Sequence, residues 1–169
     1  MRVLVTAASK HGGTQEIAAA IAAELVSRGL EVTQVSVEEV GSIDGYDAVV
    51  LGSAVYLGKW MKSAKTFAAR ESASLSAMPV WLFSSGPVGG AASKPEDEGD
   101  RREGDALAKQ IGAREHRLFA GKLDRSGLSV IERAAVKMAK AADGDYRPWD
   151  EIRAWARSIA DALRSTVSA

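Results

Sequence analysis

The segment SKHGGTQEIA (9–18) combines two adjacent glycines, hydroxyl side chains and a histidine directly after the apolar run RVLVTAA. This pattern predicts a buried strand, a turn and the start of a helix. The first N–H groups of a helix have no intrahelical partner and the helix dipole makes that end positive, so such a turn can bind a phosphate. The glycines let the backbone approach a ligand closely, and Ser9 and Thr14 supply hydroxyl donors. We therefore interpret the segment as a phosphate-binding loop.

The spacing of the glycines narrows the choice of ligand. Only Gly12 and Gly13 occur in the loop, so neither G-x-G-x-x-G nor G-x-x-x-x-G-K-[ST] is present. A dinucleotide or a nucleoside triphosphate is therefore disfavoured, and a monophosphate fits better. His11 is interpreted as a loop residue near the phosphate rather than as a catalytic group.

Apolar runs alternate along the chain with segments of helical period, which predicts parallel strands joined by helical crossovers. The expected strands are 2–8, 31–37, 46–53, 79–86 and 116–123, and the expected helices are 14–29, 62–75, 105–112, 128–142 and 148–164. The run 31–37 is less apolar and is expected nearer an edge, and the charged stretch 94–104 is interpreted as a surface loop. The fold class is therefore α/β: one domain over 1–169, with a doubly wound five-stranded parallel sheet in three α/β/α layers.

Three loops with unusual composition, 9–14, 53–60 and 84–90, follow predicted strands. In a doubly wound sheet, ligands bind beyond the carboxyl ends of the strands, at the point where the strand order reverses. We therefore expect these loops to form one site.

Composition excludes several other chemistries. The 169 residues contain no cysteine and two histidines, which removes disulfides, thiolate metal sites and thiol nucleophiles, and no metal site is expected. A formal net charge of zero gives no general attraction to nucleic acid. No leader pattern and no apolar run long enough to span a membrane were found, so a cytoplasmic protein is expected. A G-x-S-x-G elbow is also missing, which disfavours an α/β-hydrolase.

The pattern Ser9-x-x-Gly12-Gly13-Thr14 between the first strand and first helix resembles the phosphate loop of the flavodoxin family. Within that family the chain is most similar to the menaquinone-dependent protoporphyrinogen oxidase branch. The similarity is carried by Lys10 and by the segments VVLGSAVYLGKW, FAGKLD and DGDYRPWDEIRAWA.

This resemblance implies FMN as the cofactor, with its phosphate on the first loop and its isoalloxazine ring held by the second and third. The cofactor-binding residues implied in this way are Ser9, Lys10, His11, Gly12, Gly13, Thr14, Ser53, Ala54, Val55, Tyr56, Leu57, Gly58, Lys59, Trp60, Ser85, Gly86, Pro87, Val88 and Gly89. Tyr56 and Trp60 could stack on the ring or could cover the end of the sheet. Lys59 could place a positive charge near the ring or could be solvated.

The function implied is an FMN oxidoreductase that passes electrons from a small-molecule reductant, such as a porphyrinogen, to a quinone-type acceptor. FMN would carry out the electron chemistry, so no catalytic side chain is assigned. An alternative is a flavodoxin-type electron carrier, although such carriers usually present a strongly acidic face and this chain is neutral. A flavin-free interaction module is disfavoured by the glycine pair, and a phosphoacceptor receiver lacks its aspartate because Gly52 and Ser53 occupy that position.

The segment 124–145 departs from the branch, because it is rich in alanine and contains no aromatic residue. Whether it docks a membrane surface or a partner is left open, and so is a homodimer.

Overall fold

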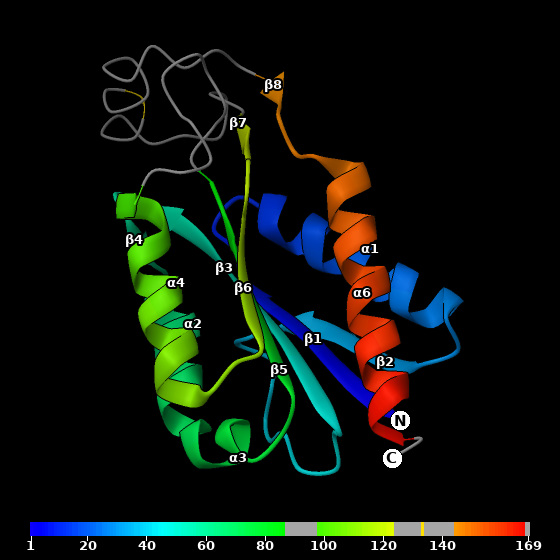
Figure 1. Cartoon of the computed structure of the whole chain (residues 1–169). Helices are drawn as coiled ribbons and strands as arrows, with labels where there is room; N and C mark the ends of the chain where they lie inside the picture. Colours follow the sequence, from blue (N-terminus) through cyan, green and yellow to red (C-terminus); the bar gives the residue numbers. More distant parts are fainter. Residues whose placement is uncertain (87–97, 124–132, 134–143, 168–169) are drawn as a thin grey trace.

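A parallel sheet forms the centre of the chain, of which the computed structural model describes residues 1–86, 98–123, 133 and 144–167 (Figure 1). The strand order is β2-β1-β3-β5-β6, so the order reverses between β1 and β3. The strands are β1 (Arg2–Ala8), β2 (Glu31–Ser36), β3 (Ala48–Tyr56), β5 (Val80–Ser85) and β6 (Glu115–Phe119).

Helices cover both faces of this sheet and complete three layers (Figure 1). One face carries α1 (Gly13–Ser27) and α6 (Trp149–Val167), and the other carries α2 (Lys62–Arg70), α3 (Ser72–Ser76) and α4 (Glu98–Ile111). Alternate residues of β1 pack against opposite helical layers, as the period of a strand requires: Val3 and Val5 join one core and Leu4 joins the other. The three-layer α/β/α fold with five parallel strands is thereby confirmed. The edge position expected for the second strand is also confirmed.

Two short antiparallel strand pairs were not expected. β4 (Lys59–Trp60) pairs antiparallel with the end of β3 and forms a hairpin there. The strand expected at 116–123 is divided into β6 and β7 (Lys122–Leu123), and β7 pairs with β8 (Gly144–Asp145) in a separate two-stranded sheet.

The interpretation of 94–104 as a surface loop is wrong from residue 98 onward, because α4 begins at Glu98. Arg102, Lys109 and Gln110 are exposed on the solvated side of this amphipathic helix. Its inner side is supplied by Gly104, Leu107 and Ile111 at helical spacing. The helix expected over 62–75 is likewise divided, with Glu71 between α2 and α3. The helix expected at 128–142 and residues 94–97 lie outside the described residues.

Candidate functional site

The loop between β1 and α1 forms the first part of the site. Gly12 takes a left-handed conformation (φ 82°) at the N-cap of α1, where a Cβ would meet nothing within 4 Å. The backbone N–H of Thr14 donates to the Ser9 hydroxyl over 3.4 Å, so the serine closes the turn. The first turn of α1 therefore directs its N–H groups and positive dipole end toward an open space beside Gly12.

The β3–β4 hairpin forms the second part of the site. Leu57 and Gly58 both have positive φ (51° and 73°), as a two-residue turn between antiparallel strands requires. The Ser53 hydroxyl accepts a hydrogen bond from the Met61 N–H (2.9 Å) and thereby ties the two ends of the hairpin together. Ser53, Ala54 and Val55 are buried within β3, whereas Leu57 at the tip is 92% exposed.

The first two loops lie against each other. The ring of His11 contacts the ring of Tyr56 edge to face, with 6.4 Å between the ring centres. Lys10 directly precedes His11 on the first loop, and Lys59 is on the same hairpin as Tyr56. Both lysine side chains are exposed. The expected meeting of the first and second loops is thus observed in the structure.

The third loop starts at Ser85 and Gly86, and Pro87, Val88 and Gly89 lie outside the described residues. The Gly86 N–H donates to the Phe119 carbonyl over 3.0 Å, which extends the β5–β6 pairing by one residue. Gly86 has φ 108°, and a Cβ there would lie 3.3 Å from the Val55 carbonyl oxygen, so the backbones of the second and third loops are close.

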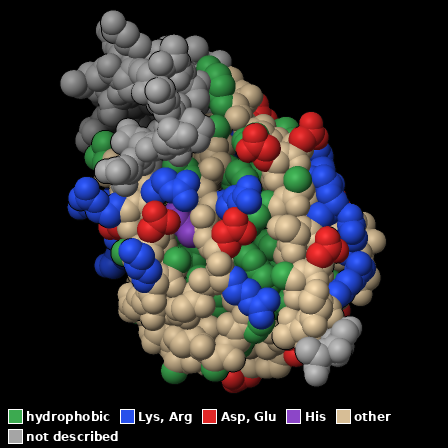
Figure 2. Space-filling model, in the orientation of Figure 1, with side chains coloured by type: hydrophobic (Ala, Val, Ile, Leu, Met, Phe, Trp, Pro, Cys, Tyr) green, Lys and Arg blue, Asp and Glu red, His purple; other side chains and the backbone are tan. Residues whose placement is uncertain are grey.

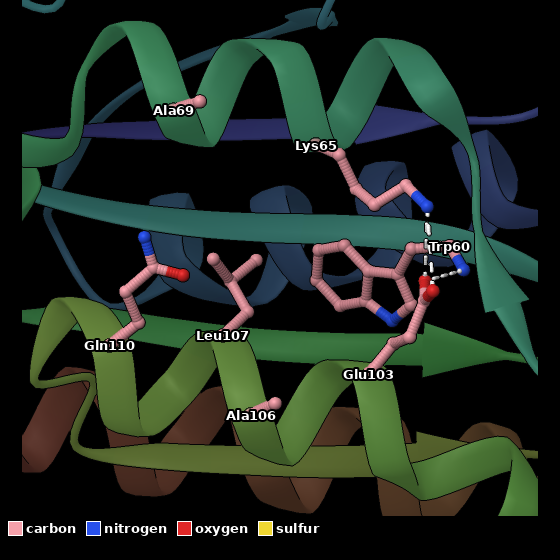
Figure 3. A pocket seen from close by; sticks show the side chains of 7 residues that line it. All are labelled: Trp60, Lys65, Ala69, Glu103, Ala106, Leu107 and Gln110. Atoms are coloured by element: carbon pink, nitrogen blue, oxygen red, sulfur yellow. Dashed lines mark hydrogen bonds and ion pairs between the residues drawn. The ribbon is translucent and has the colours of Figure 1, made fainter.

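Trp60 is one of the two aromatic residues expected to contact the isoalloxazine ring, and its side chain has several partners in the structure. Its indole is buried in a groove between α2 and α4, alongside Leu107 and the rim residues Lys65 and Glu103 (Figure 3). The Trp60 backbone N–H donates to Glu103 over 2.7 Å, and its indole N–H donates to the Ser84 hydroxyl over 2.8 Å. Stacking on a cofactor stays a prediction for both aromatic residues. For Trp60 it would require the indole to leave this groove.

Two polar clusters, each with buried members, lie behind the loops and were not predicted from the sequence. In the first, Ser84 lies 2.8 Å from Nε2 of His116, and Nδ1 of the same ring lies 2.7 Å from Asp105. Burial lowers the pKa of His116, and the bond to Asp105 opposes that change. Gly104, which the structure places inside α4, is the one sequence signal that could have indicated close packing at this place.

The second cluster is centred on Arg147, whose side chain is only 3% exposed. Its guanidinium donates to Glu16 (2.6 Å) and the Gly13 carbonyl (3.2 Å), and to both carboxylate oxygens of Asp145 (2.7 Å each). It also lies over the ring of Trp149, 4.4 Å from the ring centre. The hydrogen bonds from Arg147 lower the pKa of Asp145 to about 2, and the same pairing raises the pKa of Arg147. The C-terminal part of the chain is in this way bonded to the first turn of α1.

Basic and acidic side chains are interspersed over most of the described part of the face in Figure 2, and basic side chains gather along its right edge. Among the helices that the structure describes, none is long and apolar enough to cross a bilayer.

Comparison with known proteins agrees with this geometry. The profile of the Flavodoxin domain family matches residues 4–148. The protoporphyrinogen IX dehydrogenase [quinone] of Escherichia coli (strain K12) is 24% identical over 175 aligned positions, which cover 95% of each chain.

Solved structures share the fold at low identity. A flavodoxin from the domain Archaea superposes with a TM-score of 0.63 at 16% identity, covering 97% of this chain and 99% of that one. The rubredoxin oxygen:oxidoreductase of Desulfovibrio gigas gives a TM-score of 0.67 at 12% identity, covering 99% of this chain and 37% of that one.

The residues at the first loop fit the phosphate of FMN. The space beside Gly12 is open, the hydroxyl of Ser9 lies at the helix start, and the one acidic residue of the first turn, Glu16, is paired with Arg147. A phosphate monoester would therefore meet helix N–H groups without an uncompensated negative charge close by. The chain belongs to the flavodoxin domain family and is an FMN-binding protein.

Proposed function

We propose that the protein is an FMN-dependent oxidoreductase that takes electrons from a reduced organic substrate, protoporphyrinogen IX or a related compound, and passes them to a quinone. The observation that carries this proposal is the match to a quinone-dependent protoporphyrinogen IX dehydrogenase over 95% of both chains. In each two-electron step the substrate would lose two electrons and two protons, and one quinone would gain both and become the quinol.

We assign the phosphate of FMN to the first loop, where Ser9, Gly12, Gly13 and Thr14 surround the start of α1. The β3–β4 hairpin and the start of the third loop would flank the ring. Bound FMN supplies the chemistry of accepting and donating electrons, while the chain binds it, orients it and limits the access of water.

The tip of the hairpin supports an apolar electron partner. Leu57 is almost fully exposed although it occupies a left-handed conformation, which favours glycine or asparagine. A large apolar residue at an exposed, strained position suggests contact with a ligand or a surface. Porphyrinogens and membrane quinones are both largely apolar, so either could meet this residue beside the ring.

The proposal is tested by mixing the FMN-loaded protein with protoporphyrinogen IX and a soluble quinone without oxygen, and by following porphyrin fluorescence over time. Many turnovers per protein, lost when Gly12 is replaced by valine, are the expected result. Oxidation that stops after one equivalent per FMN would instead identify an electron carrier that needs a further protein. No oxidation with any quinone would refute the substrate assignment.

A further inference from the structure

Four residues from four different elements form one hydrogen-bonded chain behind the second and third loops. It runs from the indole N–H of Trp60 on β4 to the Ser84 hydroxyl on β5, 2.8 Å away. From Ser84 it continues to Nε2 of His116 on β6 (2.8 Å), and from Nδ1 of the same ring to Asp105 on α4 (2.7 Å). This chain is called the Trp60–Asp105 relay below.

The chemistry of the groups fixes the direction of each bond. An indole N–H can only donate, so the Ser84 oxygen accepts from Trp60. Among the described residues, His116 is the other side chain within hydrogen-bond distance of this hydroxyl, and it is the acceptor left for the Ser84 proton. Nε2 of the imidazole must then be the acceptor, and Nδ1 carries the proton that is donated to Asp105. Every buried polar atom of the relay is satisfied only when His116 is neutral.

The same order of groups occurs in serine hydrolases, but the surroundings exclude that role here. Ser84 is 0% exposed, and it lies beneath the buried indole of Trp60. A nucleophile has to reach its substrate, and this hydroxyl has no open side toward solvent. The relay therefore serves the structure around it rather than chemistry on a substrate.

Gly104 shows independently that the imidazole must occupy this place. It lies inside α4, where glycine is less favourable than alanine. A Cβ on Gly104 would lie 2.3 Å from both Cε1 and Nε2 of His116, which is too close for any real contact. Helix α4 thus accepts an unfavourable residue at the position where the ring of His116 packs.

We propose that Ser84, His116 and Asp105 are positioning residues that hold Trp60, and with it the β3–β4 hairpin, in the conformation that receives the FMN ring. This inference rests on the proposed site at the strand ends, because the hairpin is its second loop. Ser84 also directly precedes Ser85 and Gly86, so the relay acts on the third loop as well. A neutral His116 holds the hairpin, and a protonated His116 releases it.

Protonation would break the relay at its centre. Nε2 would become a donor, the Ser84 hydroxyl proton would lose its acceptor, and a buried donor without a partner is unfavourable. The charged groups that face His116 are Asp105 and Arg101 on α4, while Lys109 and Glu115 line the same surface hollow. Burial and Arg101 favour the neutral ring, and Asp105 favours the charged one.

The test compares FMN dissociation constants, measured by quenching of flavin fluorescence from about pH 8 to pH 5, in the wild type and in His116→Gln. The glutamine oxygen can still accept from Ser84 but does not titrate. We expect the wild type to lose about tenfold more affinity than the variant over this range, because protonation of His116 would favour the FMN-free protein. Titration of the FMN phosphate, and of any group outside the relay, is common to both proteins and cancels in the comparison. Identical profiles would overturn the proposal.

Two further variants test the direction of the effect. Asp105→Asn keeps an acceptor for Nδ1 but removes the charge that favours protonation, so the loss of affinity should move to lower pH. Gly104→Ala displaces the ring without removing any polar group and should weaken FMN binding at pH 8 about tenfold, as Ser84→Ala should. A shift to higher pH in the first, or unchanged binding in both others, would contradict the relay.

A readout without FMN separates this inference from the proposed site. The fluorescence difference between the wild type and Trp60→Phe reports the surroundings of Trp60 alone, and it should change with pH in the FMN-free protein and stay constant in His116→Gln. If FMN binding does not depend on the hairpin but this signal titrates, the site assignment fails and the relay stands. A signal that does not titrate refutes the relay.

Discussion

Each of the two polar clusters behind the site bonds one of its loops to other parts of the chain, but the two clusters use different chemistry. The Arg147 cluster bonds the C-terminal part of the chain to the first loop through one buried guanidinium and two half-exposed carboxylates. The Trp60–Asp105 relay bonds α4 and two strands to the second loop through the buried side chains of Trp60, Ser84 and a neutral His116, and it ends at the carboxylate of Asp105, which is 45% exposed. One cluster therefore depends on charge at every pH near neutrality, and the other depends on the absence of a charge on His116.

This difference separates the conditions under which each loop is held. An arginine stays protonated throughout the physiological range, so the first loop should keep its support from acid to alkaline conditions. A histidine is the side chain that changes charge between about pH 5 and 8, so the second loop can lose its support there. The phosphate of FMN would stay bound to the first loop, while the binding of its ring by the second loop would change with pH.

The largest effect is expected from Arg147→Met. It removes the only described cation between Glu16 and Asp145 and leaves the two carboxylates close together. We expect the free energy of unfolding to fall by about 3 kcal/mol and FMN binding to weaken, measured by urea denaturation and fluorescence titration. The matched control is Arg153→Met on α6, whose ion pair with Asp150 is exposed and should be worth less than about 0.5 kcal/mol. Equal losses in both variants would show that the buried cluster has no special role.

A smaller loss, about 2 kcal/mol, is expected from Ser84→Ala, because Trp60 and His116 both lose a buried partner. Thermal unfolding and near-UV circular dichroism of the tryptophans measure it. The matched control is Ser63→Ala on α2, since the Ser63 hydroxyl is buried and has no hydrogen-bond partner among the described residues. That control should be neutral or slightly stabilising, and a destabilised control would remove the contrast.

Lowering the pH should weaken the Arg147 cluster in a more acidic range than the relay. The pKa of Asp145 is held at about 2, below its ordinary value of 3.8, so its contribution is complete above about pH 4 and is lost as the pH falls toward 2. Because this carboxylate is 40% exposed, solvent reduces the contribution to about 1 kcal/mol or less. Urea denaturation at pH 4.5 and pH 2.5, with Asp145→Asn as reference, measures it. A difference between the two proteins that is independent of pH would contradict this assignment.

The smallest effect on stability is expected from Leu57→Asn. Asparagine tolerates the left-handed conformation of this residue better than leucine does. The free energy of unfolding should therefore stay unchanged or rise by about 0.5 kcal/mol. The KM for an apolar quinone should nevertheless rise, which steady-state kinetics would detect. Val26→Ala, at an exposed apolar residue near the far end of α1, should change neither quantity. An unchanged KM in Leu57→Asn would exclude the hairpin tip from the partner contact.

Local patterns were sufficient to predict the sheet and the first loop. The run RVLVTAA forms β1 and is buried from Val3 onward as its composition requires, and Gly12 has the positive φ that a glycine permits. The carboxyl ends of parallel strands must meet at one edge, so the meeting of the first and second loops followed from topology, and the structure shows it in the contact between His11 and Tyr56.

The polar clusters could not be predicted because their members are far apart in sequence. Arg147 contacts Glu16 across 131 residues, and Ser84 contacts His116 across 32, with no period to link them. The inward direction of Trp60 depends on Ser84 in the same way. The start of α4 was missed for another reason, since charged residues at 98–103 hide the apolar side that begins at Gly104.

The packing of α6 against α1 has a consequence for synthesis of the chain on the ribosome. The helix that opens the phosphate loop is made early, but its buried face, including Ile17, Ile21 and Leu25, packs in one core with Ile152, Trp155 and Ile159 of α6. Until α6 has left the ribosome, the part of that apolar face that is not packed on the sheet lacks its cover and is open to chaperones or to aggregation. The nascent chain therefore completes the support for its first loop only after nearly all of its described residues have been made.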